Sequence, residues 1–197
     1  MRAREYRYFG EGLCALAHRG GWAAGPEVEN SVAAFTAAVE LGYRHLETDV
    51  HATADGVLVA FHDARLDRVT DASGAVAALP ASEVARARIG GREPIPTLDE
   101  LLETFPDACF NIDIKADAAT RPLARAIARH AAQDRVCVGS FSTRRLQEFR
   151  RLAGTRVATS VDPLGVVWYA YGVLGRRLLV PAGQALQVPV RDEGTSI

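Results

Sequence analysis

Cysteine is scarce in this chain, with Cys14, Cys109 and Cys137 the only three among 197 residues. The number is odd and no CxxC pair occurs, which argues against a disulfide framework. Each cysteine lies in a short apolar stretch, so we expect buried thiols in a reducing compartment and a cytoplasmic protein. None lies in an electropositive loop, so a cysteine nucleophile is not expected.

The chain also lacks an excess of charge and a long apolar run. With 23 basic and 24 acidic residues the net charge is −1, and no long like-charge run points to a nucleic-acid partner. The longest apolar stretch, Val166–Leu174, is broken by Gly172 and is far shorter than the roughly 20 residues of a membrane span. We interpret it as a helix in or beside the core, with a lipid-contact surface as the alternative. The apolar stretch Leu13–Ala17 is too short for a signal peptide.

Strand and helix patterns alternate along the chain without a linker or an internal repeat, which predicts one domain over residues 1–197. Alternation of this kind predicts an α/β fold with a parallel sheet. Helices are expected from Asn30 or Ser31 to Gly42, from Thr97 to Phe105, after Lys115 to about His130, and from Ser142 to about Leu152. The predicted strands are Leu13–Ala17, Tyr43–Val50, Val57–His62, Cys109–Lys115, Arg135–Phe141 and Arg156–Val161, with a further candidate at Ala185–Val190.

Four polar islands lie in these strands: His18-Arg19-Gly20, Glu47-Thr48-Asp49, His62-Asp63 and Asn111 to Lys115. An unpaired charge is costly to bury, so such residues are kept where they pair with each other, a metal or a ligand. All four are placed at the ends of their predicted strands. A barrel collects its active site there from several strands, whereas an open sheet uses one switch point. Four contributing strands therefore favour a TIM-type barrel.

Glu47 and Asp49 are two residues apart on a strand, so both face away from Leu46, Thr48 and Val50. Two carboxylates at such a short separation repel each other unless a cation lies between them. Oxygen ligands of this kind suit Mg²⁺, Ca²⁺ or Mn²⁺. A solvated strand end, or an acid pair neutralised by arginines, is the alternative interpretation.

Asn111, Asp113 and Lys115 repeat the same spacing on another strand, with Ile112 and Ile114 on the opposite face. Asp113 would complete an acidic metal triad, and Lys115 would neutralise a substrate oxygen. A buried ion pair between Asp113 and Lys115 explains the spacing equally well.

Two histidines are candidates for proton transfer. A neutral imidazole accepts a proton near physiological pH and a protonated one donates it, and both His18 and His62 lie beside acids. A structural role explains one such histidine, but two at strand ends favour catalysis. Arg19 offers a bidentate fork for phosphate, and Gly20 and Gly21 let backbone N–H groups approach an anion. The remaining histidines are not expected in the site: His45, His51 (placed beyond its strand end) and His130.

Taken in order, these motifs resemble the glycerophosphodiester phosphodiesterase family. The likeness spans about residues 13–141 and continues weakly to Gln187-Val188-Pro189. The matching segments are Ala17-His18-Arg19-Gly20-Gly21, Glu29-Asn30-Ser31, Glu47-Thr48-Asp49-Val50, Thr53-Ala54-Asp55-Gly56, Phe61-His62-Asp63, Ile95-Pro96-Thr97-Leu98, Asn111-Ile112-Asp113-Ile114-Lys115 and Ser140-Phe141.

The resemblance implies a TIM barrel that uses a divalent metal, usually Mg²⁺ or Ca²⁺, to hydrolyse a glycerophosphodiester to glycerol 3-phosphate and an alcohol during glycerophospholipid breakdown. The family more often has Glu at the position of Asp113. Either histidine would serve as the acid and the other as the base. By motif position the implied metal ligands are Glu47, Asp49 and Asp113, the acid–base pair is His18 and His62, the substrate phosphate contacts are Arg19 and Lys115, and Glu29 lies at the rim.

The length departs from that family. A TIM barrel typically needs about 250 residues and eight strands, and about six strands are counted here, with a small insertion at Ala64–Glu93 after the second strand. We therefore expect an incomplete, C-terminally truncated barrel whose open edges favour a homo-oligomer. Two other functions stay open: phospholipase D-like cleavage of lipid phosphodiesters, and an inactive truncated barrel that binds metal or phosphate.

Overall fold

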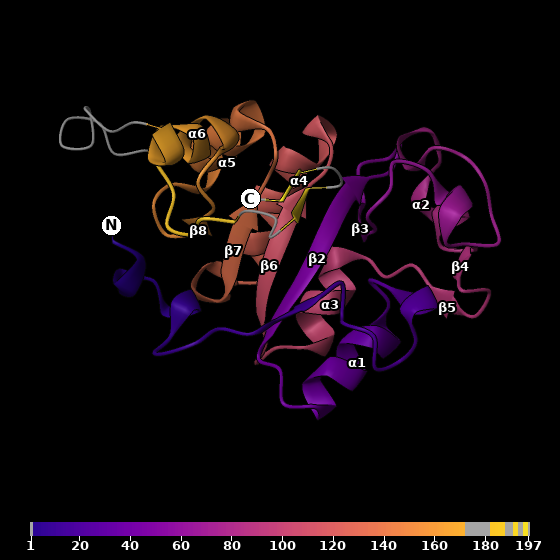
Figure 1. Cartoon of the computed structure of the whole chain (residues 1–197). Coiled ribbons are helices and arrows are strands. Elements are labelled where there is room, and N and C mark those ends of the chain that lie inside the picture. The colour runs from indigo at the N-terminus through magenta and orange to yellow at the C-terminus, as the bar shows by residue number, and fades with distance from the viewer. Residues whose placement is uncertain (1, 172–181, 188–190, 193–194, 197) are drawn as a thin grey trace.

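The computed structural model describes residues 2–171, 182–187, 191–192 and 195–196. A mainly parallel sheet forms its centre (Figure 1), and β3 (Leu58–Ala60) adds to it by pairing antiparallel with β2. A parallel bridge from Ser160 to Ala185 continues the pairing beyond β8. The parallel strands, in sheet order, are β1 (Leu16–His18), β2 (His45–Ala52), β6 (Cys109–Ile114), β7 (Val136–Gly139) and β8 (Ala158–Thr159).

The predicted α/β alternation is confirmed, since helices connect the parallel strands. Short polar side chains begin α1, α3 and α5, because such a side chain satisfies a free N–H of the first turn. Ser31, not Asn30, caps α1 by accepting from the N–H of Ala34 at 3.1 Å, and Thr97 caps α3 by accepting from Glu100 at 3.1 Å. The helices are α1 (Val32–Glu40), α2 (Ala81–Val84), α3 (Leu98–Thr104), α4 (Asp117–Arg129), α5 (Thr143–Ala153) and α6 (Pro163–Tyr171).

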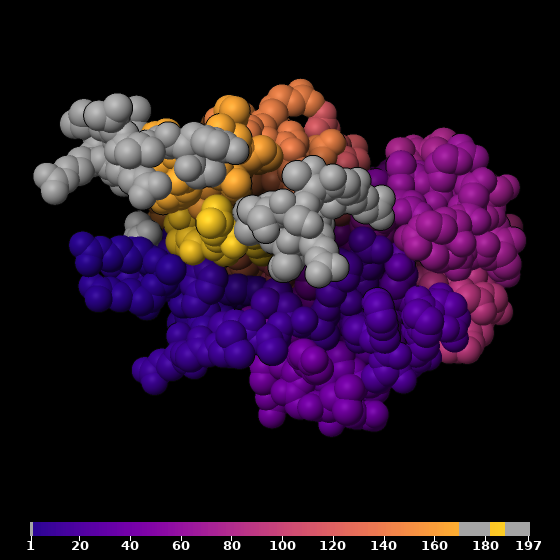
Figure 2. Space-filling model, in the orientation of Figure 1, coloured from indigo at the N-terminus to yellow at the C-terminus, as the bar shows by residue number. Residues whose placement is uncertain are grey.

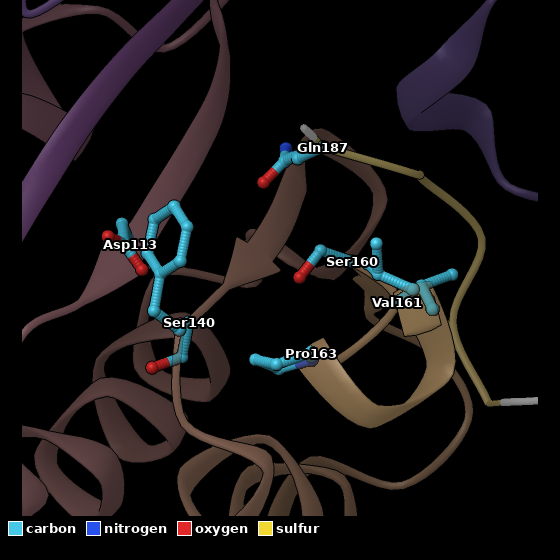
Figure 3. Close-up of a pocket in the computed structure, with 8 residues that line it drawn as sticks. Asp113, Ser140, Ser160, Val161, Pro163 and Gln187 are labelled. Atoms are coloured by element: carbon cyan, nitrogen blue, oxygen red, sulfur yellow. The ribbon is translucent and has the colours of Figure 1, made fainter. Parts of the chain in front are cut away.

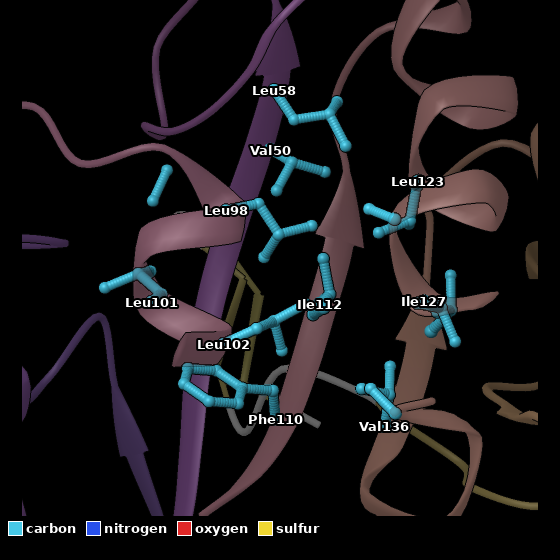
Figure 4. Close-up of a cluster of buried hydrophobic side chains, with 14 of the residues drawn as sticks. Val50, Leu58, Leu98, Leu101, Leu102, Phe110, Ile112, Leu123, Ile127 and Val136 are labelled. Atoms are coloured by element: carbon cyan, nitrogen blue, oxygen red, sulfur yellow. The ribbon is translucent and has the colours of Figure 1, made fainter. Parts of the chain in front are cut away.

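One face of the sheet packs against α1, α3, α4 and α5 to form the main hydrophobic core. Because side chains alternate along a strand, every second residue of β6 enters this core: Phe110 and Ile112 are fully buried. Figure 4 shows Leu102 of α3 on one side of these residues and Ile127 of α4 on the other. On the opposite face, the described residues form a smaller cluster in which Tyr6 and Tyr8 pack against Cys137 of β7 and Ala158 of β8.

That opposite face carries the polar residues. The parallel register sets Glu47 beside His18 of β1 and Asn111 of β6, and it sets Asp49 beside Asp113. The predicted division of β2 into an acidic face and an apolar face is therefore confirmed. Register alone brings three of the four polar islands to one place.

Two strand assignments were wrong. The strand predicted to end at Val50 continues to Ala52, so Glu47 and Asp49 lie within β2, not at its end, and His51 is buried within the strand. The cause is β3, which pairs antiparallel with the last residues of β2 and keeps them extended. His62 therefore does not end a parallel strand. It follows a hairpin and comes back toward Asp49, whose carbonyl accepts the N–H of Phe61 at 2.9 Å.

The insertion after β3 forms a small lobe beside the sheet, the magenta bulge in the space-filling view (Figure 2). Its own hydrophobic cluster includes the fully buried Leu66, Val76 and Ile89, together with Phe61 from the hairpin. The lobe holds α2 and an antiparallel pair, β4 (Arg88–Ile89) and β5 (Glu93–Pro94). It is thus a packed unit anchored to the segment that carries His62.

The structure also bears on the expected burial of the cysteines and on the apolar stretch near the C-terminus. All three cysteines are free, but only Cys137 is buried, while Cys14 and Cys109 are half-buried. The apolar stretch Val166–Leu174 lies in α6 as far as Tyr171, and its remaining residues fall outside the described ones. Across the described ranges, no helix has the length and apolar character needed to cross a bilayer. The further strand candidate Ala185–Val190 also extends into residues outside the described ones.

Core burial gives the first testable expectation. Leu101 of α3 is fully buried, whereas Leu13 is 97% exposed. We expect Leu101→Ala to lower the free energy of unfolding by about 2–5 kcal/mol, because it removes buried apolar contacts and leaves a cavity, and Leu13→Ala to change it by less than about 0.5 kcal/mol. Urea denaturation of both variants measures the difference. Equal effects of the two substitutions would contradict the packing described here.

Candidate active site

The first part of the site lies at the end of β1. His18 is the last residue of that strand, and its Nε2 lies 3.8 Å from Oε2 of Glu47. Arg19 then adopts a positive φ of 51° and donates its backbone N–H to the same oxygen at 3.0 Å. Gly20 follows so close to α1 that a Cβ would lie 2.6 Å from the Cβ of Ala34. Only glycine fits there, and the tight loop leaves the imidazole of His18 open to solvent.

A buried carboxylate, Asp49, forms the centre of the site. Nζ of Lys115 lies 2.9 Å from its Oδ1, and Asn30 donates from Nδ2 to its Oδ2 at 3.2 Å. Nε of Arg19 lies 3.3 Å from the same Oδ2. Thr48 in turn donates to Oδ1 of Asn30 at 2.8 Å and so fixes the amide. Positive charge and donors therefore surround this carboxylate on both oxygens.

Lys115 joins the two central strands. Besides Asp49 of β2, its Nζ contacts Oδ2 of Asp113 in β6 at 2.7 Å. Burial alone would lower the pKa of Lys115, but the two carboxylates outweigh it and raise that pKa, so the ammonium stays charged. The ion pair between Asp113 and Lys115 that the spacing allowed is therefore present.

Glu47 has a different electrostatic environment. Burial and the nearby charge of Asp49 raise the pKa of Glu47 to about 8, and Arg19 offsets this only in part. A carboxyl group of this kind is largely protonated at neutral pH. Any cation placed beside it would favour its ionised form.

The three predicted metal ligands, Glu47, Asp49 and Asp113, lie on adjacent strands of the polar face. In the parts of the chain that the structure describes, no group of three or more His, Cys, Asp or Glu side chains is arranged as a ready metal site. Oδ1 of Asp113 is nevertheless buried without a hydrogen-bond partner. Carboxylate oxygens fit a hard divalent cation in kind, and Lys115 competes with such a cation for Asp49 and Asp113.

His62 reaches the site from the segment after β3, which pairs with the same edge of β2 as β1 does. Its Nδ1 lies 2.6 Å from Oδ1 of Asp63, and its carbonyl bonds to Nε2 of His51 at 3.1 Å. The nearby charges affect His18 as well: partial burial and Arg19 lower the pKa of His18, with a smaller contribution from His62 in the same direction. The two candidate proton-transfer groups thus lie within electrostatic reach of each other.

Glu29, predicted at the rim, is held by two arginines. Nη1 of Arg19 lies 3.2 Å from its Oε2, and Nη2 of Arg68 lies 2.5 Å from its Oε1. Arg68 comes from the insertion, in the short 3-10 helix Leu66–Arg68. The rim is therefore built by the segment between β1 and α1 together with the insertion.

Four residues of this network had no predicted role in the site: Asn30, His51, Asp63 and Arg68. Asn30 and Asp63 belong to two of the family motifs, Glu29-Asn30-Ser31 and Phe61-His62-Asp63, but Asn30 was considered only as a helix cap. His51 was assigned to the wrong side of a strand boundary. The role of Arg68 was missed because Glu29, one of its two partners, lies 39 residues away and is brought to it by tertiary packing.

A pocket of about 170 Å³ adjoins Asp113. In Figure 3, Asp113 lies on one side of the pocket and Val161 on the other. Phe141, after β7, and Val166 of α6 add apolar surface. Gln187 donates from Nε2 to Asn111 at 2.7 Å and closes one end. The pocket joins the charged site to an apolar surface.

Comparison with known proteins agrees with this arrangement. The model of the glycerophosphoryl diester phosphodiesterase family matches residues 18–163. The Mycobacterium tuberculosis protein named probable glycerophosphodiester phosphodiesterase 2 is 44% identical over 167 residues, which are 84% of this chain and 63% of that protein. A glycerophosphodiester phosphodiesterase of Caldanaerobacter subterraneus is 36% identical over 152 residues, covering 70% of this chain and 62% of that protein.

Solved structures show the same fold. The crystal structure of a glycerophosphodiester phosphodiesterase from Agrobacterium tumefaciens superimposes with a TM-score of 0.67 at 28% identity, over 74% of this chain and 64% of that one. An Oleispira antarctica phosphodiesterase, solved in complex with the product sn-glycerol-3-phosphate, gives a TM-score of 0.67 at 27% identity, over 74% and 64%. The chain thus spans just under two thirds of the length of these relatives. Sequence, fold and the order of the motifs agree, and the chain belongs to the glycerophosphoryl diester phosphodiesterase family, whose fold is a TIM barrel.

Proposed function

We propose that this chain hydrolyses glycerophosphodiesters to glycerol 3-phosphate and an alcohol with the help of a divalent metal. The observation that carries the proposal is that His18 and His62 lie within electrostatic reach of each other, beside buried, cation-paired carboxylates. A phosphodiester needs a proton removed from its nucleophile and one delivered to its leaving oxygen, and two histidines supply both.

The lowered pKa of His18 suits it to the role of base, because its imidazole is neutral at physiological pH and ready to accept a proton. His62, oriented by Asp63, would then donate to the leaving alkoxide. Arg19 and Lys115 would stabilise charge on the phosphate oxygens. Both cations are now paired with carboxylates, so a bound phosphate would share them with Asp49.

Glu47, Asp49 and Asp113 are the residues that would hold the metal. When bound, a divalent cation would polarise the phosphoryl group and offset the negative charge of the site. The support comes from the oxygen-only donor set, the unpartnered Oδ1 of Asp113 and the raised pKa of Glu47. Mg²⁺, Ca²⁺ and Mn²⁺ all suit such ligands.

Histidine substitutions test the proton-transfer roles. In an assay of glycerol 3-phosphate release from glycerophosphocholine with Mg²⁺, Ca²⁺ or Mn²⁺, we expect His18→Ala and His62→Ala to lower kcat at least about 100-fold. His130→Ala is the matched control, because His130 pairs with Asp99 at 2.8 Å, away from the site. A variant that keeps its rate would remove that histidine from the mechanism. A cooperatively folded wild-type chain without any release would favour the inactive alternative.

Metal binding should depend on pH through Glu47. Its carboxyl must lose a proton to bind a cation, and its pKa is about 8. The affinity for Mn²⁺ should therefore rise with pH, by up to about tenfold per pH unit, and level off above about pH 8. Isothermal titration calorimetry measures this together with the proton released, and Glu47→Gln should remove the dependence. A constant affinity between about pH 6 and 8 would contradict the assigned ligand.

A second substrate class has specific support. The pocket beside Asp113 has apolar walls from Val161, Pro163 and Val166, which suit a hydrocarbon group close to the phosphate. A mouse relative named lysophospholipase D GDPD1 is 37% identical over 115 residues, 52% of this chain and 36% of that protein. Lysophospholipids, whose acyl chain would lie in this pocket, are therefore the alternative substrates.

Substitutions on α6 separate the two substrate classes. Val166 lines the pocket, whereas its neighbour Val167 is 55% exposed and does not. If lysophosphatidylcholine is a substrate, Val166→Asp should lower choline release from it at least about tenfold while glycerophosphocholine turnover changes little, because a buried carboxylate disfavours the acyl chain. Val167→Asp should affect neither. Equal losses on both substrates in Val166→Asp would assign no acyl role to the pocket.

A further inference from the structure

We propose that Arg68, which the insertion carries, positions His62 for proton transfer and that it acts through Asp63. The inference rests on the proposed function, because only there does His62 exchange a proton with a substrate. It assigns a role in the site to the insertion.

The first step concerns the proton on His62. Oδ1 of Asp63 lies 2.6 Å from Nδ1 of His62. Partial burial raises the pKa of Asp63, but the hydrogen bonds from Arg68 and His62 outweigh it and hold that pKa below its usual range. Asp63 is therefore an ionised acceptor without a proton of its own, so Nδ1 must be the donor. Nε2 is then the nitrogen that remains for the substrate.

The second step concerns what holds Asp63. Arg68 reaches it with two nitrogens: Nε lies 2.5 Å from Oδ2, and Nη2 lies 3.3 Å from Oδ1. The same Nη2 also lies 2.5 Å from Oε1 of Glu29, a residue just before α1. The guanidinium therefore clamps two carboxylates that come from different parts of the fold. A planar fork allows this, whereas a lysine ammonium is a single point charge.

The clamp is continuous with the centre of the site. Arg19 holds Glu29 from its other side and also contacts Asp49. The insertion supports the opposite end, because Leu66, two residues before Arg68, is fully buried in the core of the lobe. Cations and carboxylates thus alternate from the buried acid to the imidazole, in the order Asp49, Arg19, Glu29, Arg68, Asp63, His62.

A role for Arg68 in stability alone does not explain why it contacts both Asp63 and Glu29 beside the site. The side chain of Arg68 is 49% exposed, and ion pairs at such positions contribute little to the stability of a fold. Substitution should therefore leave the fold intact while it frees Asp63 to rotate. A carboxylate that rotates no longer fixes the ring of His62, and a small misplacement of a catalytic group is enough to slow the reaction.

A double-mutant cycle tests the assignment. We expect Arg68→Gln to lower kcat for glycerophosphocholine about 10-fold with KM changed less than about twofold, and Asp63→Asn to lower kcat about 100-fold. The combined variant should be no slower than Asp63→Asn, because Arg68 acts through Asp63. Arg65→Gln is the matched control: Arg65 pairs with Asp67 at 3.2 Å in the same lobe, outside the site, and should leave the rate unchanged. Additive losses, or a rise in KM alone, would overturn the proposal.

A spectroscopic measurement tests the positioning of His62 independently of the proposed diesterase activity. In ¹⁵N NMR of the full chain, we expect the neutral ring of His62 to carry its proton on Nδ1. The tautomer should become mixed in Arg68→Gln and in Asp63→Asn, while melting temperatures stay close to that of the wild type. An unchanged His62 spectrum in Arg68→Gln overturns the positioning role, whatever the activity. If the wild-type chain lacks diesterase activity, the proposed function fails, and the positioning of His62 is still decided by these spectra.

Discussion

The buried carboxylate of Asp49 is the constraint on which the site depends. A charge out of water is stable only where opposite charge and hydrogen bonds surround it. Lys115, Arg19 and Asn30 meet that requirement from three different segments: the end of β6, the loop after β1 and the residue before the cap of α1. The need to neutralise one strand residue thus fixes where the neighbouring segments must lie.

The antiparallel strand β3 adds a feature that a simple parallel sheet lacks. It extends β2 beyond Asp49 and returns the chain so that Phe61 bonds to the carbonyl of that same residue. His62 therefore follows a strand on the same edge of β2 as β1, the strand that ends at His18. The insertion packs on this hairpin through Phe61 and Leu66. Its lobe is therefore mechanically linked to one of the two histidines.

Much of this could be predicted from the sequence, because the informative patterns are local. Alternation along a strand placed Glu47 and Asp49 on the face opposite Leu46 and Val50, and a cap at Asn30 or Ser31 followed from their short polar side chains. The family resemblance brought the remaining motifs together in order. The assignments that failed or were missed depend on pairing between segments, which the residue pattern within one segment does not reveal. The extent of β2 is set by β3, and the role of Arg68 depends on Glu29, 39 residues away.

Charge in the whole network bears on the proposed metal. If every acid is ionised and the histidines are neutral, five carboxylates face three cations, which leaves two uncompensated negative charges. Protonation removes part of this excess, as the pKa of about 8 for Glu47 indicates. A divalent cation carries the charge that would balance the excess and let Glu47 ionise, and an anionic phosphate would increase the need for it. The groups counted are Glu29, Glu47, Asp49, Asp63 and Asp113 against Arg19, Arg68 and Lys115.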